Sequence, residues 1–238
     1  AGDIRKLSAS GLILASGKGI EPYLSKLPDS LSGDQKIIDI GSEIPSLVIS
    51  EDSGLFVCCP HHSEGSVDPH WWHSVKNMQR ATKIVAAAFS LADPDNEAAY
   101  KQRAKAYDVQ LATLAKWARK EIARIPRSER KLATAHAAYT YFCEEFGFKS
   151  MPVQGLAREH EVSTQYLADV IVDLKTFQVK AVFPESQANP KVLQEMVRGS
   201  GARLGGLLYA DFTGDAKTTT YEAMFRHNVT TILAGLAP

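Results

Sequence analysis

The sequence predicts an α/β protein of two lobes, each built on a parallel β-sheet and joined by one long helix. Near both ends of the chain, short apolar runs alternate with helical stretches, a pattern typical of parallel sheets covered by helices. A single long helical pattern separates these two regions. The 238 residues, 45% of them hydrophobic, are enough for two cores. We therefore expect residues 1–93 to form an N-terminal lobe, 94–126 a linking helix and 127–238 a C-terminal lobe.

The first lobe begins with a helix near Asp3. The apolar run "GLILASG" is typical of a buried strand that turns into a helix, here "IEPYLSKL", and "KIIDIG" predicts a second short strand. Residues 42–68 contain glycines, prolines and paired histidines, and we expect a surface loop interrupted by the strand "GLFVCC".

Two helices follow this loop. In residues 74–91, apolar side chains recur at spacings of three and four, with Ser74 as the N-cap, and Asp93-Pro94 ends the helix. The second helix spans residues 95–124 and would be about 45 Å long at 1.5 Å per residue. That length exceeds the need of one small lobe, so we expect this helix to span both lobes.

The second lobe repeats the alternation of strand and helix four times. The predicted strands are "KLATA", "SMPVQGL", "KAVFPE" and "RLGGLLYA". The predicted helices are "YTYFCEEFG", "TQYLADVIVDLKTFQ", "KVLQEMVRGSG" and "TYEAMFRHNVTTILAGL". Ligands of parallel sheets bind at the carboxyl ends of the strands. His136, Glu185 and Asp211 follow three of these strands, so we expect their side chains to lie at a binding site.

Charge and composition exclude several partners. The 27 basic residues equal the 27 acidic ones, so no net positive field attracts nucleic acid, and we expect no nucleic-acid partner. The chain has no apolar run of the roughly 18 residues that a membrane helix needs, and no secretory leader at Ala1. Three cysteines, Cys58, Cys59 and Cys143, allow at most one disulfide, whose existence stays open. No nucleophile, phosphate-loop or dinucleotide motif is present.

His70, His136 and Asp211 supply three of the four ligands of a tetrahedral zinc site. Glu185 is a candidate hydrogen-bond partner of a ligand imidazole, or an alternate ligand. Each residue also has an ordinary structural explanation. His70 could pack on its neighbouring tryptophans, His136 could be a buried or capping histidine, and Asp211 and Glu185 could be solvated loop acids, with Asp215 as a rival of Asp211.

The remaining histidines carry weaker signals. Cys58, Cys59, His61 and His62 are a possible accessory metal cluster, but their spacing lacks the separated cysteine pairs of a structural zinc module. The alternative is a strand end followed by a polar loop. His73, His160 and His227 have no partner pattern, and we assign them to the surface or to packing.

A family resemblance rests on several segments taken in order. These segments are "DPHWWHSVKN", the long helix, "TAHAAYTYFCEEFGF", "PVQGL", "KAVFPESQANPKVLQEM", "LYADF" and "TYEAMFRHNVTTILAGL". Together they resemble the zinc/manganese class of solute-binding proteins of bacterial ABC transporters, over nearly the whole chain. The resemblance implies two α/β lobes joined by a rigid helix, a metal ion held between them, a periplasmic or membrane-anchored location, and delivery to a membrane permease. We also expect a monomer.

The resemblance also assigns site residues. His70 matches the family's histidine after Asp-Pro, His136 its second-lobe histidine or glutamate, and Asp211 its late aspartate, while Glu185 matches a supporting or alternate position. Histidine at 136 favours Zn(II) over Mn(II), because imidazole is the better zinc ligand.

Two departures from the family pattern stand out. Family members begin with a further strand and a first-ligand histidine upstream of the segment that "AGDIRKL" matches, so we expect one ligand to be missing here. Either the chain is shortened, or three protein ligands act with water, with His61 or His62 as a candidate substitute. Trp72-His73-Ser74 stands where members more often carry an aliphatic residue and then aspartate or serine.

The main hypothesis is a carrier that captures Zn(II) without bond chemistry, and not an enzyme. One alternative is a zinc hydrolase, with water at an open fourth position and Glu185 as general base. A second alternative is a metal-linked surface adhesin of the same fold.

Overall fold

The computed structural model describes residues 2–23, 26, 35–48, 67–154, 164–185 and 190–237. The chain divides into two compact units. The first unit contains Ala1–Ser46 and Val75–Thr113, and the second contains Leu47–Ser74 and Leu114–Pro238. Contacts thus group the described residues 47–48 and 67–74 with the second unit, whereas the sequence boundaries assigned them to the first lobe. The division at residues 93 and 126 stays a prediction.

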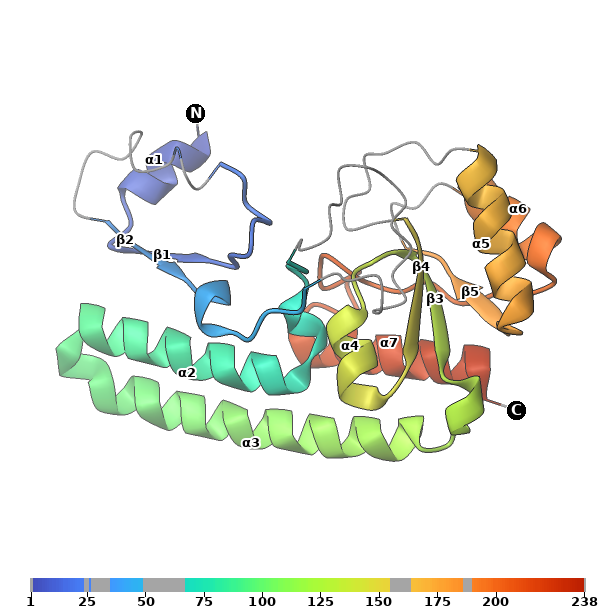
Figure 1. Cartoon of the computed structure of the whole chain (residues 1–238). Helices are drawn as coiled ribbons and strands as arrows, with labels where there is room; N and C mark the ends of the chain where they lie inside the picture. The colour runs from blue at the N-terminus through green and yellow to red at the C-terminus, as the bar shows by residue number, and fades with distance from the viewer. Residues whose placement is uncertain are drawn as a thin grey trace. The chain divides into compact units, whose positions relative to one another are not determined.

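The first unit carries a two-stranded parallel sheet. After α1 (Gly2–Ser8), strand β1 (Leu12–Ala15) pairs with β2 (Lys36–Asp39), with Ile13 opposite Ile37 (Figure 1). Helix α2 (Val75–Ala92) contacts β1 and is followed by the short turn η6 (Pro94–Asn96). The parallel strands and the helix that ends before Pro94 agree with the sequence prediction.

The helix predicted in "IEPYLSKL" is wrong at its start, whereas Lys26 lies in a short 3-10 turn. Residues 20–23 form a bend and a turn, while residues 24, 25 and 27 are outside the described part of the chain. The reason lies just upstream, where Gly17, Lys18 and Gly19 all have positive φ angles and fold the chain back. The Glu21 carboxylate then accepts the backbone N–H groups of Ser16 and Gly17, at 2.7 and 3.0 Å, and holds this loop closed.

Helix α3 (Glu97–Ile122) is the long helix that the sequence predicts. Its 26 residues correspond to about 39 Å. Residues 97–113 belong to the first unit and residues 114–122 to the second, so the helix contributes to both. This confirms a long connecting helix.

The second unit contains a four-stranded parallel sheet in the order β4-β3-β5-β6. Its strands are β3 (Lys131–His136), β4 (Lys149–Gln154), β5 (Ala181–Phe183) and β6 (Arg203–Leu204). Its helices are α4 (Thr140–Phe146), α5 (Thr164–Thr176), α6 (Pro190–Ser200) and α7 (Tyr221–Leu236), together with the short turns η5 (Trp71–His73) and η7 (Arg127–Glu129). The predicted alternation and the predicted parallel sheet are confirmed.

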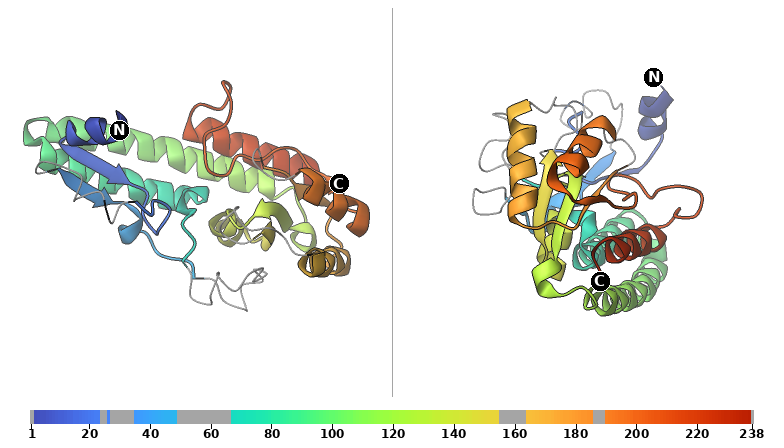
Figure 2. Two further views of the ribbon diagram at one scale, coloured as in Figure 1. Left: turned by 90° about the horizontal axis from the view of Figure 1, so that it is seen from above. Right: turned by 90° about the vertical axis from the view of Figure 1, so that its right-hand side faces the viewer.

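Helices cover both faces of this sheet. Side chains of β3, β4 and β5 pack with α5 and α6 in one apolar cluster, which includes Met151, Val182 and Met196. On the other face, the ring of Phe183 lies against Gly235 of α7. Figure 2 (right) shows α5 and α7 on opposite sides of β3 and β4. Successive side chains of a strand point to opposite faces, which explains why Val182 and Phe183 enter different cores.

The predicted strand "RLGGLLYA" is shorter than expected. Strand β6 ends at Leu204, and pairing resumes only as a single parallel bridge between Glu185 and Leu208. An added Cβ would lie 2.5 Å from the Phe183 ring at Gly205 and 2.7 Å from Thr231 at Gly206. The two glycines let the backbone approach these side chains, and the strand is interrupted there. Residues 208–211 therefore continue along the sheet edge without a regular ladder.

Some predicted features lie outside the residues that the structure describes. They are the strand "GLFVCC", Cys58, Cys59, His61, His62 and His160. Cys143 is a buried free cysteine, and burial raises the pKa of its thiol to about 12. Among the described residues, no helix combines the length and the apolarity needed to cross a membrane.

Candidate metal centre

His70, His136 and Asp211 come together in the second unit. One ligand atom from each of these three residues lies within 4.8 Å of the other two. The Nε2 atoms of both histidines are 3.6 Å from Oδ1 of Asp211. Metal-to-ligand bonds of about 2.1 Å in a tetrahedron place neighbouring ligand atoms about 3.4 Å apart. These two distances therefore suit a small divalent cation held by both imidazoles and the carboxylate.

Asp68 fixes the orientation of His70. Asp68 and Pro69 precede His70, which immediately precedes the turn η5. One oxygen of Asp68 accepts the backbone N–H of His70 at 2.8 Å and lies 2.7 Å from Nδ1 of the same residue. Both side chains are buried. A proton on Nδ1 that points to Asp68 leaves the lone pair of Nε2 for a metal. The sequence analysis missed this role, although the Asp-x-His spacing carries the signal.

Glu185 holds His136 in the same way. His136 ends β3, and Glu185 lies just after the neighbouring strand β5. The Glu185 carboxylate pairs with Nδ1 of His136 and accepts its backbone N–H at 3.1 Å. Glu185 is only 3% exposed, so it is not the solvated loop acid of the alternative interpretation. The contact is the one that a hydrogen-bond partner of a ligand imidazole would make.

The electrostatics of His136 follow from its two acidic neighbours. Burial lowers its pKa, but hydrogen bonds and charges from Asp211 and Glu185 outweigh burial and raise the pKa to about 9. At neutral pH, His136 of the metal-free protein is therefore positively charged, with a proton on each ring nitrogen, and it lies between the Asp211 and Glu185 carboxylates. A metal ion that binds Nε2 must displace the proton on that nitrogen.

Asp211 is the most exposed of the three residues. Its side chain is 32% exposed, while those of His70 and His136 are 4% and 1% exposed. An ion would therefore meet solvent on the carboxylate side. The rival Asp215 is not part of the cluster, because its carboxylate accepts the N–H of Lys217 at 2.8 Å in a local turn.

Side chains replace the missing strand ladder around Asp211. The amide of Asn228 accepts the N–H of Tyr209 at 2.9 Å and donates to its carbonyl at 2.8 Å, and the Tyr139 hydroxyl donates to the same carbonyl at 3.0 Å. The next carbonyl, of Ala210, accepts hydrogen bonds from Trp72 and His73.

His73 is buried, as the packing assignment allows, but its polar contact was missed. His227 lies on α7 with Nε2 2.9 Å from the Leu207 carbonyl.

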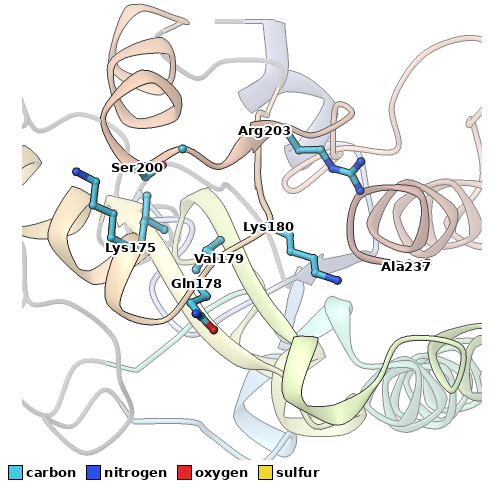
Figure 3. Close-up of a pocket in the computed structure, with 9 residues that line it drawn as sticks. Lys175, Gln178, Val179, Lys180, Ser200, Arg203 and Ala237 are labelled. Atoms are coloured by element: carbon cyan, nitrogen blue, oxygen red, sulfur yellow. The ribbon is translucent and has the colours of Figure 1, made fainter.

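A hollow elsewhere in this unit is lined by residues other than His70, His136 and Asp211. Its volume is about 730 Å³, and Figure 3 shows Lys175, Lys180 and Arg203 around it. It lies where α5, α6 and α7 end and β5 and β6 begin, whereas His136 lies at the carboxyl end of the sheet. Arg203 donates to the carbonyls of Ala234 and Gly235 in the last turn of α7. Cations at helix carboxyl ends compensate the helix dipoles, and this accounts for the basic lining.

Comparison with known proteins identifies the family. A family model described as ZnuA, zinc-uptake complex component A, periplasmic, matches residues 1–235. The chain belongs to this family. Over 99% of its length it is 36% identical to the manganese-binding lipoprotein MntA of Bacillus subtilis, and it covers 76% of that protein. Over its full length it is 31% identical to the zinc-binding protein TroA of Treponema pallidum, again covering 76%.

Solved structures agree with the ZnuA-family fold. The periplasmic zinc-binding protein TroA of Treponema pallidum superposes with a TM-score of 0.85 at 28% identity, covering the whole chain and 85% of TroA. The manganese-bound periplasmic metal-binding protein from Candidatus Liberibacter asiaticus has a TM-score of 0.85 at 24% identity, covering 99% of the chain and 84% of that structure. The predicted class is confirmed as a metal-binding, substrate-binding component of an ABC transporter and not an enzyme.

Proposed function

We propose that this ZnuA-family protein captures Zn(II) with His70, His136 and Asp211 and delivers it to the membrane permease of a metal ABC transporter. Family membership supports a location outside the cytoplasm, periplasmic or membrane-anchored. The observation that carries the proposal is the convergence of both Nε2 atoms on one carboxylate oxygen at 3.6 Å.

The nature of the ligand atoms supports zinc as the cargo. Two imidazoles and one carboxylate suit Zn(II), whereas Mn(II) favours sites richer in oxygen ligands. Glu185 would add a further oxygen, but both of its oxygens face His136. The names of the relatives do not decide the metal, because they include manganese-, zinc- and iron-binding proteins. We therefore propose Zn(II) as the preferred ion and Mn(II) as its weaker competitor.

The protein's contribution to capture is preorganisation. Asp68 and Glu185 hold the two rings with Nε2 facing Asp211, so few side-chain rotations need to be restricted when the ion binds. His61 and His62 remain the candidates for a fourth ligand that the sequence analysis named. Water is the alternative occupant of that position, as in three-ligand zinc sites.

The described residues do not favour another function. The hydrolase hypothesis requires Glu185 to act as a base on a bound water, but Glu185 is 3% exposed and its oxygens contact His136. No specific observation in the described part of the chain favours an adhesin.

Asp211 and Asp215 offer a matched pair of variants that tests the site. We expect Asp211→Asn to weaken Zn(II) binding by more than the roughly 10- to 100-fold that loss of a ligand's hydrogen-bond partner costs, because the carboxylate would be a direct ligand. Asp215→Asn, which changes a nearby carboxylate outside the cluster, should bind as the parent does. Competition dialysis against equimolar Zn(II) and Mn(II), followed by metal analysis, measures both affinity and preference. Retained Mn(II) in the presence of Zn(II) would contradict the zinc assignment, and equal binding by the two variants would contradict the site.

A further inference from the structure

The residues that follow His70 also touch the segment that carries Asp211. The indole Nε1 of Trp72 donates to the Ala210 carbonyl at 2.8 Å, and Nε2 of His73 lies 3.0 Å from the same oxygen. Ala210 immediately precedes Asp211. One carbonyl therefore joins the turn η5, which begins after His70, to the backbone that positions the carboxylate.

His73 is suited to donate this hydrogen bond and not to bind the ion. Its ring is 1% exposed and packs on Tyr139, with ring centroids 4.3 Å apart. Burial, with a smaller contribution from neighbouring charge, lowers its pKa to about 3, so the ring is neutral and carries one proton. A carbonyl oxygen can only accept a hydrogen bond, so that proton lies on Nε2. The Ala210 carbonyl thus accepts two hydrogen bonds, one from Trp72 and one from the buried, neutral His73.

This contact matters because of the local backbone. The strand ladder is interrupted after Leu204, and Asp211 is the most exposed of the three candidate ligands. Asp68 and Glu185 directly hold the two histidine rings, whereas the backbone before Asp211 is held at Ala210 by Trp72 and His73. Movement of the backbone before Asp211 away from His70 would stretch or break the hydrogen bonds at Ala210.

We propose that Trp72 and His73 are positioning residues that set the rate of metal release by holding Asp211 against His70. The inference rests on the proposed function and deepens it. In the proposed release step the backbone that carries Asp211 moves away from His70, and the two hydrogen bonds at Ala210 oppose that movement.

Three variants separate hydrogen bonding from packing. Trp72→Phe and His73→Phe remove a donor and keep an aromatic ring, whereas His73→Gln keeps an N–H donor at about the reach of Nε2. Trp117→Phe is the matched control, because Trp117 lies in the same unit and stacks on Arg226. Zn(II) release into excess chelator is followed by stopped flow, and the association rate is measured separately. Circular dichroism confirms folding of each variant.

Each donor-removing variant should release Zn(II) about 2- to 10-fold faster, as expected for one net hydrogen bond, with an unchanged association rate. His73→Gln and Trp117→Phe should release it within about 2-fold of the parent. Parent-like release by Trp72→Phe and His73→Phe would overturn the inference. Release from His73→Gln that is as fast as release from His73→Phe would also overturn it. If His73→Phe does not fold, Trp72→Phe decides, because Trp72 is only half-buried.

Asp211→Asn distinguishes the failure of this inference from failure of the proposed function. If Asp211→Asn binds Zn(II) as the parent does, the proposed site itself is wrong. If Asp211→Asn loses binding but the donor variants release the ion normally, the site stands and only the positioning role is wrong.

Discussion

At the scale of single residues, two buried carboxylates determine how the histidines face the candidate site. Asp68 and Glu185 occupy equivalent roles, each on Nδ1 of a histidine whose Nε2 points to Asp211. The sequence singled out Glu185 because it follows a predicted strand, and Glu185 does contact His136, while its role at a metal site stays a prediction. It could not place His73, since the contact with Ala210 joins residues 137 positions apart.

Asp68→Asn tests the orientation of His70. The amide keeps the shape of the side chain but removes the charge that stabilises a proton on Nδ1. We expect Zn(II) affinity to fall about 10- to 100-fold, the usual cost of losing a partner of a metal-bound histidine. Calorimetry beside Asp215→Asn, an exposed acid on the same unit, provides the comparison. An unchanged affinity in Asp68→Asn would show that His70 needs no such partner.

His136 makes metal binding depend on pH. Its pKa of about 9 in the metal-free protein means that an ion displaces about one proton per chain near pH 7.5. Apparent affinity for Zn(II) should therefore fall up to tenfold for each unit of pH below 9. Calorimetric titrations in two buffers of different ionisation enthalpy count the released protons. Release of no proton would contradict a charged His136.

The raised pKa of His136 also affects the stability of the metal-free fold, and this effect changes with pH in the direction opposite to the Zn(II) affinity. A pKa raised from 6.5 to about 9 stabilises the folded state fully below pH 6.5, and this contribution is lost as the pH rises toward 9. Affinity for the ion and stability without it should therefore change in opposite directions across this interval.

At the scale of elements, the alternation of strand and helix predicted the second sheet and its covering helices, because buried parallel strands are short apolar runs. The prediction failed where a single contact determines the backbone conformation. Glu21 folds back onto Ser16 and Gly17 in place of a helix, and the glycines of "RLGG" interrupt a strand that composition alone would extend. Neither contact leaves a periodic signal in the sequence.

Gly205→Ala tests the account of the interrupted strand. The added Cβ would lie 2.5 Å from the Phe183 ring, so the side chain or the strand must shift. We expect a loss of about 1–3 kcal/mol in the free energy of unfolding, as for other overpacked sites. Urea denaturation measures the loss, and Gly11→Ala is the control because nothing lies within 4 Å of its added Cβ. Equal stability of both variants would show that Phe183 adapts without cost.

At the scale of the whole molecule, the proposed carrier function depends on candidate ligands that are far apart in sequence. His136 ends β3, whereas His70 and Asp211 lie in loops, and the three side chains come together in the second unit. The sequence singled out the three positions because each lies where a loop meets regular structure, and their role as ligands stays a prediction. The distances that make them one candidate site required the fold.

The most direct measurement is a calorimetric Zn(II) titration of this chain beside His136→Ala, with Asp211→Asn as a second variant and circular dichroism to confirm folding. The account predicts one Zn(II) per chain, with binding lost in His136→Ala and strongly weakened in Asp211→Asn. Zn(II) binding that is absent from the parent chain, or indifferent to His136, would contradict the proposed site.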